Sequence, residues 1–146
     1  MRVSVIGGST ATEHERELAE GVGRQLGRRG HDLVCGGLGG VMRAACKGAT
    51  EADGRTIGIL PGDDPAAANR YVEIPVATGV GHARNPMVVL NGDAAVAVDG
   101  GPGTFTEIGF AWVYGRPIAG LETHDVPVVE AVDSPAAAVD YVEQEV

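Results

Sequence analysis

The sequence predicts an α/β fold in which a mostly parallel sheet carries helices on both faces. Short apolar runs rich in Val, Ile and Ala alternate along the chain with longer segments whose apolar residues recur at helical spacing. Three of the short runs are followed at once by a glycine cluster. Strands and helices that alternate in this way form right-handed βαβ units, whose loops meet at the carboxyl edge of the sheet.

The length and composition of the chain are those of a globular domain. With 146 residues it has the size of one ordinary domain, and we expect residues 1–146 to form a single one. Hydrophobic residues make up 44%, but no apolar run approaches the ~20 residues of a membrane span. The chain enters a strand pattern directly after Met1, without the apolar core of a signal peptide, so we expect a cytoplasmic location.

The chain is strongly acidic, with a formal net charge of −9, and Lys47 is the only lysine among its 11 basic residues. Charge of this sign repels nucleic-acid backbones and anionic membranes, so we expect neither as a partner. An excess of acid with almost no lysine is typical of proteins adapted to high intracellular salt. We therefore expect a halophilic-type protein, whose melting temperature rises with molar salt.

Seven segments have the composition and length of strands. They are residues 2–6, 32–35, 55–60, 71–76, 94–98, 116–120 and 127–132. Pro75 has no backbone N–H to donate to a neighbouring strand, which favours an edge position for the strand at 71–76. The run of Ala and Val at 94–98 is apolar throughout, as expected for the centre of a parallel sheet.

Five segments are expected to be helices. They run from a start near residues 10–13 to about residue 29, and over 41–52, 84–91, 104–114 and 134–144. The first helix can begin with a capping box at Thr10 or at Thr12, and Gly30 ends it. Pro86 is compatible with the third helix because it falls in the first turn.

The three glycine clusters predict a ligand crevice, because a single cluster is a common tight turn but three at one sheet edge are not. The backbone N–H groups of such loops and of a helix N-terminus bind anions such as phosphate. The candidate phosphate- or nucleotide-binding residues are Gly7, Gly8, Ser9, Gly36, Gly37, Gly39, Gly40, Gly100, Gly101, Gly103 and Thr104. No cluster reads G-x-G-x-x-G with an acidic residue ~20 positions on, or ends in Gly-Lys-Ser/Thr, which disfavours a dehydrogenase and an ATPase.

Glu107 and Arg84 each allow two interpretations. Residues 104–107 fit a capping box, in which Glu107 only closes the first turn of a helix that starts at Thr104. Alternatively, Glu107 is a carboxylate next to a bound phosphate, which suggests chemistry on a phosphorylated small molecule. Arg84 follows the fourth strand and is either a surface residue or a cation that holds a phosphate or a ribose.

Other polar residues near the clusters have weaker signals. Asp99 ends its strand as a turn residue or as a partner for a ligand hydroxyl. Arg43 and Lys47 lie one helical turn apart behind the second cluster, on a solvated face or over a phosphate. Cys35 and Cys46 are too few for a metal cage and are expected to be buried free thiols, and the four histidines form no ligand pair, so no metal site is predicted.

The segment 104–114 predicts self-association. Phe105, Phe110, Trp112 and Tyr114 recur at helical spacing, and we expect them in the core or against a second subunit. The helix that carries them is apolar over most of its circumference, which is more than one buried face requires. We therefore expect a homodimer or a homotetramer.

Three of these motifs resemble the Lonely Guy family, whose members have been mistaken for lysine decarboxylases. Residues 100–107 read Gly-Gly-Pro-Gly-Thr-Phe-Thr-Glu and are similar to that family's GGxGTxxE motif. Residues 36–42 resemble its second glycine motif, and residues 82–84, His-Ala-Arg, resemble its Met-His-x-Arg-Lys segment. The likeness extends from the first strand to about Trp112.

The resemblance implies a Rossmann-like three-layer α/β/α fold and a nucleotide phosphate at Gly101, Gly103 and Thr104. Lonely Guy enzymes are dimeric phosphoribohydrolases that cut the N-glycosidic bond of nucleoside 5′-monophosphates, and they require no cofactor. The resemblance places their catalytic Arg and Glu at Arg84 and Glu107. A carboxylate that stabilises or captures the positive charge formed on the ribose makes this assignment chemically reasonable.

The sequence departs from that family in ways that leave a second function open. Asn85 stands where the family has Lys, Gly81 where it has Met, and Asp99 where it has Pro. In length and at residues 83–85, Ala-Arg-Asn, the chain is more similar to a short branch that includes the molybdenum cofactor carrier proteins. That branch implies a non-catalytic carrier of a molybdopterin, or a nucleotide sensor. Lysine decarboxylation is disfavoured, because Lys47, the only lysine, lies within a helix.

Overall fold

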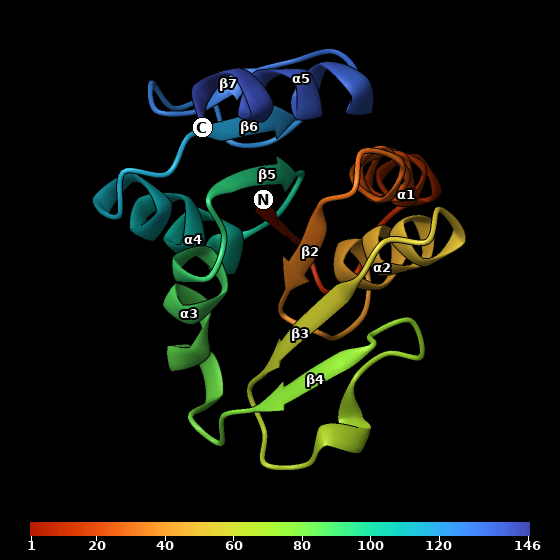
Figure 1. Ribbon diagram of the computed structural model, residues 1–146. Helices are drawn as coiled ribbons and strands as arrows, with labels where there is room; N and C mark the ends of the chain where they lie inside the picture. The colour runs from red at the N-terminus through yellow and green to blue at the C-terminus, as the bar shows by residue number, and fades with distance from the viewer.

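The computed structural model describes residues 1–146 as an open sheet with five α-helices and two 3₁₀ turns (Figure 1). The strands are β1 (Arg2–Gly7), β2 (Asp32–Cys35), β3 (Thr56–Leu60), β4 (Ile74–Ala77), β5 (Ala94–Val98), β6 (Ile118–Leu121) and β7 (Glu130–Ala131). The helices are α1 (Glu13–Arg28), α2 (Val41–Glu51), α3 (Asn85–Leu90), α4 (Pro102–Val113) and α5 (Pro135–Glu145), and the 3₁₀ turns are η1 (Pro65–Ala67) and η2 (Gly81–Arg84).

All seven strands are parallel and pair in the order β4-β3-β2-β1-β5-β6-β7. The chain moves outward from β1 on one side and returns to β5 on the other, so the strand order reverses between β1 and β5. Ligands of open α/β sheets bind outside the carboxyl ends of the strands at such a reversal. The expected Rossmann-like α/β/α fold is confirmed, and the sheet is entirely rather than mostly parallel.

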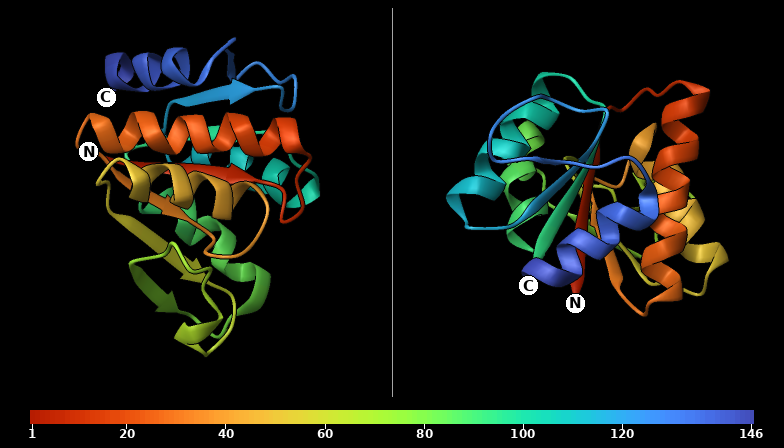
Figure 2. Two further views of the ribbon diagram at one scale, coloured as in Figure 1. Left: turned by 90° about the vertical axis from the view of Figure 1, so that its right-hand side faces the viewer. Right: turned by 90° about the horizontal axis from the view of Figure 1, so that it is seen from above.

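Helices cover both faces of the sheet, as Figure 2 shows, with α1 and α2 on one side and α3 and α4 on the other. Successive residues of β5 point to opposite faces: Val96 and Val98 join the core under α1, α2 and α5, whereas Ala95 and Ala97 join the core under α3 and α4. Both faces are therefore dry, which explains why β5 is apolar throughout.

The expected elements are all present, with shifts at several ends. Thr12 and Glu15 form the capping box of α1, so the second of the two candidate boxes is the real one. β4 lies at the sheet edge as expected but begins only at Ile74, because the Tyr71 carbonyl accepts hydrogen bonds from the hydroxyls of Thr50 and Thr56 instead of joining the sheet. No helix has both the length and the apolar character that crossing a bilayer requires.

The start of α4 differs from the expected one, and this difference affects the site. The helix begins at Pro102, two residues before the expected Thr104, with Gly101 as its N-cap. Proline at the first helical position is pre-set for the helix by its fixed φ and has no N–H to leave unpaired. Thr104 and Glu107 therefore lie inside the helix and do not form a capping box.

Two helical glycines let α1 and α2 pack closely against each other. A Cβ at Gly23 of α1 would collide with the backbone carbonyl of Ala45, and one at Gly48 of α2 would collide with that of Glu20. Backbone cannot move aside as a flexible side chain can. Glycine is thus required here for helix contact, although it weakens each helix intrinsically.

We expect Gly23→Ala to destabilise the protein by about 2 kcal/mol or more, because the methyl group overpacks the contact between α1 and α2. Gly109→Ala in α4 is the matched control, since a Cβ there meets nothing within 4 Å. The control should gain about 0.5–1 kcal/mol from helix propensity alone. Urea unfolding of the two variants measures both values, and a Gly23→Ala variant as stable as Gly109→Ala would contradict the close packing.

Candidate functional site

The candidate site is a cavity of about 520 Å³ at the carboxyl edge of the sheet, in front of the strand reversal. Segments that are far apart in the sequence line it. It is bounded by the end of β1 and the loop after it, Gly36 after β2, Pro61 after β3, the turn η2, and the first turns of α4. Its size is in the range of pockets that hold nucleotide-sized ligands.

The structure brings most of the predicted site residues into this one cavity. Those that line it are Gly7, Gly8, Ser9, Gly36, Arg84, Gly101, Gly103, Thr104 and Glu107. The predicted residues that do not line it are Gly37, Gly39, Gly40 and Gly100. These four shape the loops from behind: Gly40, for example, has a positive φ of 60° and packs against the backbone of Gly8 and Ser9, where a Cβ would clash.

The first turn of α4 offers an anion site. Gly101, the N-cap, has no side chain to accept from the helix, and no other side chain caps it. The backbone N–H groups of Gly103 and Thr104 belong to the first turn, which has no intrahelical acceptors, and they carry the positive end of the helix dipole. Gly100, with φ of 110°, lies so close to the Thr104 hydroxyl that any side chain there would displace it.

Arg84 is buried at the base of the cavity, with 7% of its surface exposed, and three acceptors fix its guanidinium. Nε donates to the Ile59 carbonyl at 2.8 Å, Nη2 donates to the Gly36 carbonyl at 3.2 Å, and Nη1 donates to Oδ1 of Asn85. Burial lowers the pKa of Arg84, and the charge of Glu107 opposes that shift. Arg84 is therefore a positioned cation and not a surface residue.

Glu107 faces the same cavity with 7% of its surface exposed, and its carboxylate accepts no hydrogen bond from the protein. Burial raises its pKa to about 7, and the nearby charge of Arg84 only partly offsets this. No nitrogen of Arg84 lies within 4.0 Å of the carboxylate, so the two form no direct ion pair. A buried carboxyl group with free oxygens can accept a proton, donate one, or stabilise a positive charge.

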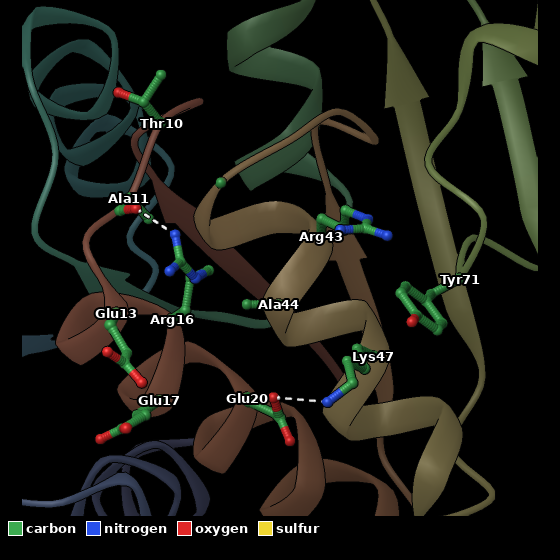
Figure 3. Close-up of a pocket in the computed structure, with 11 residues that line it drawn as sticks. Thr10, Ala11, Glu13, Arg16, Glu17, Glu20, Arg43, Ala44, Lys47 and Tyr71 are labelled. Atoms are coloured by element: carbon green, nitrogen blue, oxygen red, sulfur yellow. Dashed lines mark hydrogen bonds and ion pairs between the residues drawn. The ribbon is translucent and has the colours of Figure 1, made fainter.

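A second hollow of about 620 Å³ lies over α1 and α2 and is shown in Figure 3. Arg43 and Lys47 line this hollow and not the candidate site. Lys47 forms ion pairs with Glu20 and Glu51, and the Arg43 guanidinium lies 5.5 Å from the ring centre of Tyr71. The interpretation of a solvated face therefore fits better than a contact with a phosphate in the candidate site.

The structure also places Asp99, the two cysteines and the aromatic residues of α4. Asp99 does not line the cavity; it is a turn residue with φ of 47°, and its carbonyl accepts from Thr123. Cys35 and Cys46 are buried free thiols as expected. For Phe105, Phe110 and Trp112, which are 50%, 38% and 65% exposed, the alternative of packing in the core is wrong, and that of contact with a second subunit stays a prediction.

Two lining residues next to Arg84 received no role from the sequence. His82 lies in the turn η2, and Asn85 begins α3 with only 8% of its surface exposed. The sequence signal that could have identified them is their position beside Arg84, the predicted cation just before a helix. Nothing in the sequence showed that Asn85 is buried, because its neighbours come from α4.

With this geometry in view, the fold and the glycine loops define a Rossmann-like α/β domain. The chain belongs to the SLOG cluster4 family, whose model matches residues 1–146. An uncharacterized protein from Archaeoglobus fulgidus is 39% identical over 145 residues, which cover 97% of this chain and 93% of that protein. A cytokinin riboside 5′-monophosphate phosphoribohydrolase from Mycobacterium tuberculosis is 33% identical over 117 residues, which cover 77% of this chain and 60% of that enzyme.

Solved structures are similar over nearly the whole chain. The molybdenum cofactor binding protein from the phototrophic bacterium Rippkaea orientalis matches with a TM-score of 0.93 and 30% identity, covering 99% of this chain and 96% of that one. The molybdenum cofactor carrier protein from Chlamydomonas reinhardtii matches with a TM-score of 0.88 and 33% identity, covering 98% and 96%. The expected membership in the superfamily of Lonely Guy and molybdenum cofactor carrier proteins is confirmed.

The raised pKa of Glu107 predicts a pH dependence of stability. Its value is about 7 in the folded protein against 4.5 for an ordinary Glu. Between these pH values the folded protein keeps a proton that the unfolded chain has released. Stability therefore falls as pH rises through this window, by about 3 kcal/mol in total.

Glu107→Gln should remove this loss, because the amide does not titrate. We expect the variant to match the parent near pH 4.5 and to be more stable at pH 8, as measured by urea unfolding at constant salt. If the free energies of unfolding of the two proteins differed by the same amount at pH 4.5 and at pH 8, the raised pKa of Glu107 would be contradicted.

Proposed function

We propose that this chain binds a phosphorylated heterocyclic compound in the cavity at the carboxyl edge and acts on it as a nucleoside 5′-monophosphate phosphoribohydrolase. The observation that carries the proposal is Glu107, a buried carboxyl group without a protein partner, held beside a fixed Arg84. A site that only binds an anion gains nothing from a carboxylate, which repels the phosphate. A site that stabilises positive charge on a ribose needs one.

The roles of the residues follow from their positions. The phosphate lies at the N-terminus of α4, against the N–H groups of Gly103 and Thr104. Arg84 orients the phosphate or the sugar through the N–H groups that its protein acceptors leave free. As the N-glycosidic bond breaks, electrons move to the base, and ionised Glu107 stabilises the positive charge on the ribose. Water supplies a hydroxyl group to the sugar and a proton to the base, giving free base and ribose 5-phosphate.

A second candidate function is that of a non-catalytic carrier of the molybdenum cofactor. The likeness in fold and length to the proteins from Rippkaea orientalis and Chlamydomonas reinhardtii favours it. The same cavity can hold the phosphate group of a molybdopterin, because the N–H donors of the uncapped turn at Gly101–Thr104 bind a phosphate in the same way whether it belongs to a nucleotide or to a pterin. Gly101, Gly103 and Thr104 would hold that phosphate, and the metal-bearing end would be cargo.

Incubation of the protein in molar salt with AMP, CMP, GMP and UMP separates the two functions. We expect chromatography to show free base and ribose 5-phosphate from at least one nucleotide, at a rate that rises with pH through about 7 as Glu107 ionises. Glu107→Gln should lower that rate by about two orders of magnitude or more, as loss of an electrostatic stabiliser does. Binding without base release by the parent would instead identify a carrier or sensor.

We further propose that the protein associates with a second copy through α3 and α4, which lie side by side on one face of the sheet (Figure 1). The exposed large apolar residues of these two helices, together called the apolar face, are Met87, Leu90, Phe105, Phe110, Trp112 and Val113. Two copies with a net charge of −9 repel each other, and these two helices carry no charged residue except the buried Glu107. Contact through this face therefore avoids most of the repulsion.

Sedimentation at micromolar concentration tests the proposed assembly. We expect a dimer, or a tetramer if further faces take part, and we expect Trp112→Glu to give a monomer because it places a charge on the apolar face. Arg70→Glu makes a larger change of charge and serves as the control, because Arg70 lies against the ring of Tyr71, which also contacts Arg43 of α2 on the other side of the sheet. A parent protein that sediments as a monomer would exclude the assembly.

A further inference from the structure

Asn85 is held with its amide group in one orientation. Arg84 is a donor only, so the Asn85 atom that meets Nη1 must be the carbonyl oxygen Oδ1. The amide nitrogen Nδ2 consequently lies on the other side of the group. It is 3.9 Å from the position that a Cβ of Gly103 would occupy, at the first turn of α4.

Both amide hydrogens of Asn85 are without an acceptor in the protein. Nδ2 makes no side-chain hydrogen bond, and it is not among the fully enclosed polar atoms that lack a partner, so it opens onto the cavity that Asn85 lines. Gly103 is its neighbour there, and Glu107 lines the same cavity. A neutral donor beside the N–H groups of α4 is suited to an anionic oxygen.

An ordinary structural role does not account for this placement. Asn at the start of a helix commonly caps it with the side chain, but α3 has no side-chain cap, and the Asn85 oxygen is committed to Arg84. Arg84 itself spends three of its five N–H groups on Ile59, Gly36 and Asn85, which leaves two for a ligand. Asn85 thus helps Ile59 and Gly36 to fix the direction in which those two remaining groups point.

We propose that Asn85 is both a positioning residue for Arg84 and a direct donor to the ligand phosphate, so that it links η2 to the first turn of α4 around one anion. The part concerning the phosphate rests on the proposed function. A lysine at this position would place a second cation against Arg84, whereas the amide accepts from Arg84 and donates to the phosphate at the same time. Because the Asn85 amide makes both hydrogen bonds, we expect the site to prefer ligands whose phosphate lies next to Gly103.

Asn85→Asp still accepts from Arg84 but replaces the donor with a carboxylate that also repels a phosphate, so the neutral variant Asn85→Ala is needed to test the loss of the donor alone. Calorimetric titration with AMP, and separately with inorganic phosphate, should show binding weakened about tenfold or more in both variants. Asn91→Asp is the matched control: Asn91 ends the same helix, donates to the Met87 carbonyl and does not line the cavity. It makes the same change of charge and should bind like the parent.

A second readout needs no ligand and tests the positioning of Arg84. Asn85→Ala removes the acceptor of Arg84 Nη1 without adding a charge. If Asn85 positions Arg84, the pH midpoint at which Glu107 titrates, followed by the pH dependence of stability, should shift in Asn85→Ala and stay unchanged in Asn91→Ala. An unshifted midpoint would overturn the positioning role. Binding of AMP and phosphate by Asn85→Ala within twofold of the parent would overturn the donor role. A parent that binds neither probe would overturn the proposed function and the donor role together, while the pH midpoint still decides the positioning role.

Discussion

Two opposite charges held out of water at the carboxyl edge of the sheet, those of Arg84 and Glu107, explain much of the surrounding structure. A buried charge costs several kcal/mol unless hydrogen bonds replace its water. Arg84 obtains such bonds from the backbone carbonyls of Ile59 within β3 and Gly36 after β2 and from Asn85, whereas Glu107 obtains none. The two groups therefore differ: the guanidinium of Arg84 is hydrogen-bonded and fixed, whereas the carboxyl group of Glu107 is free to bind a proton or to contact a ligand.

Glycine makes this arrangement possible by letting backbones come close together. At Gly36 a side chain would strike the guanidinium of Arg84, and at Gly7 it would strike Val41 and the Val98 carbonyl. Without these two glycines the loops after β1 and β2 would stand away from the cavity, and Arg84 would lose a carbonyl acceptor. The glycine clusters thus serve a second purpose beyond turning the chain: they admit a large buried cation among main-chain atoms.

The sequence indicated the fold and the location of the site because these depend on periodic and local signals. Strand and helix patterns predict parallel βαβ units, and such units bring the segment of Arg84, after β4, and that of Glu107, after β5, to one edge. The start of α4 was missed because Thr104 is a good cap by composition, yet Pro102 after Gly101 begins the helix earlier. Two of the three acceptors of Arg84 could not be predicted, because they are backbone carbonyls, which every residue type has. The burial of Asn85 depends on α4, a contact that no local pattern encodes.

The position of β1 at the centre of the sheet has a consequence for the order of folding. β1 is the first strand to be synthesised, but it lies between β2 and β5, and Val3 pairs with Ala94 and Gly7 with Val98. One edge of β1 therefore stays open until about two-thirds of the chain has left the ribosome, and open apolar edges invite aggregation. Since the cavity needs both β1 and the first turns of α4, it forms late, and a ligand can stabilise the finished fold but cannot assist its early steps.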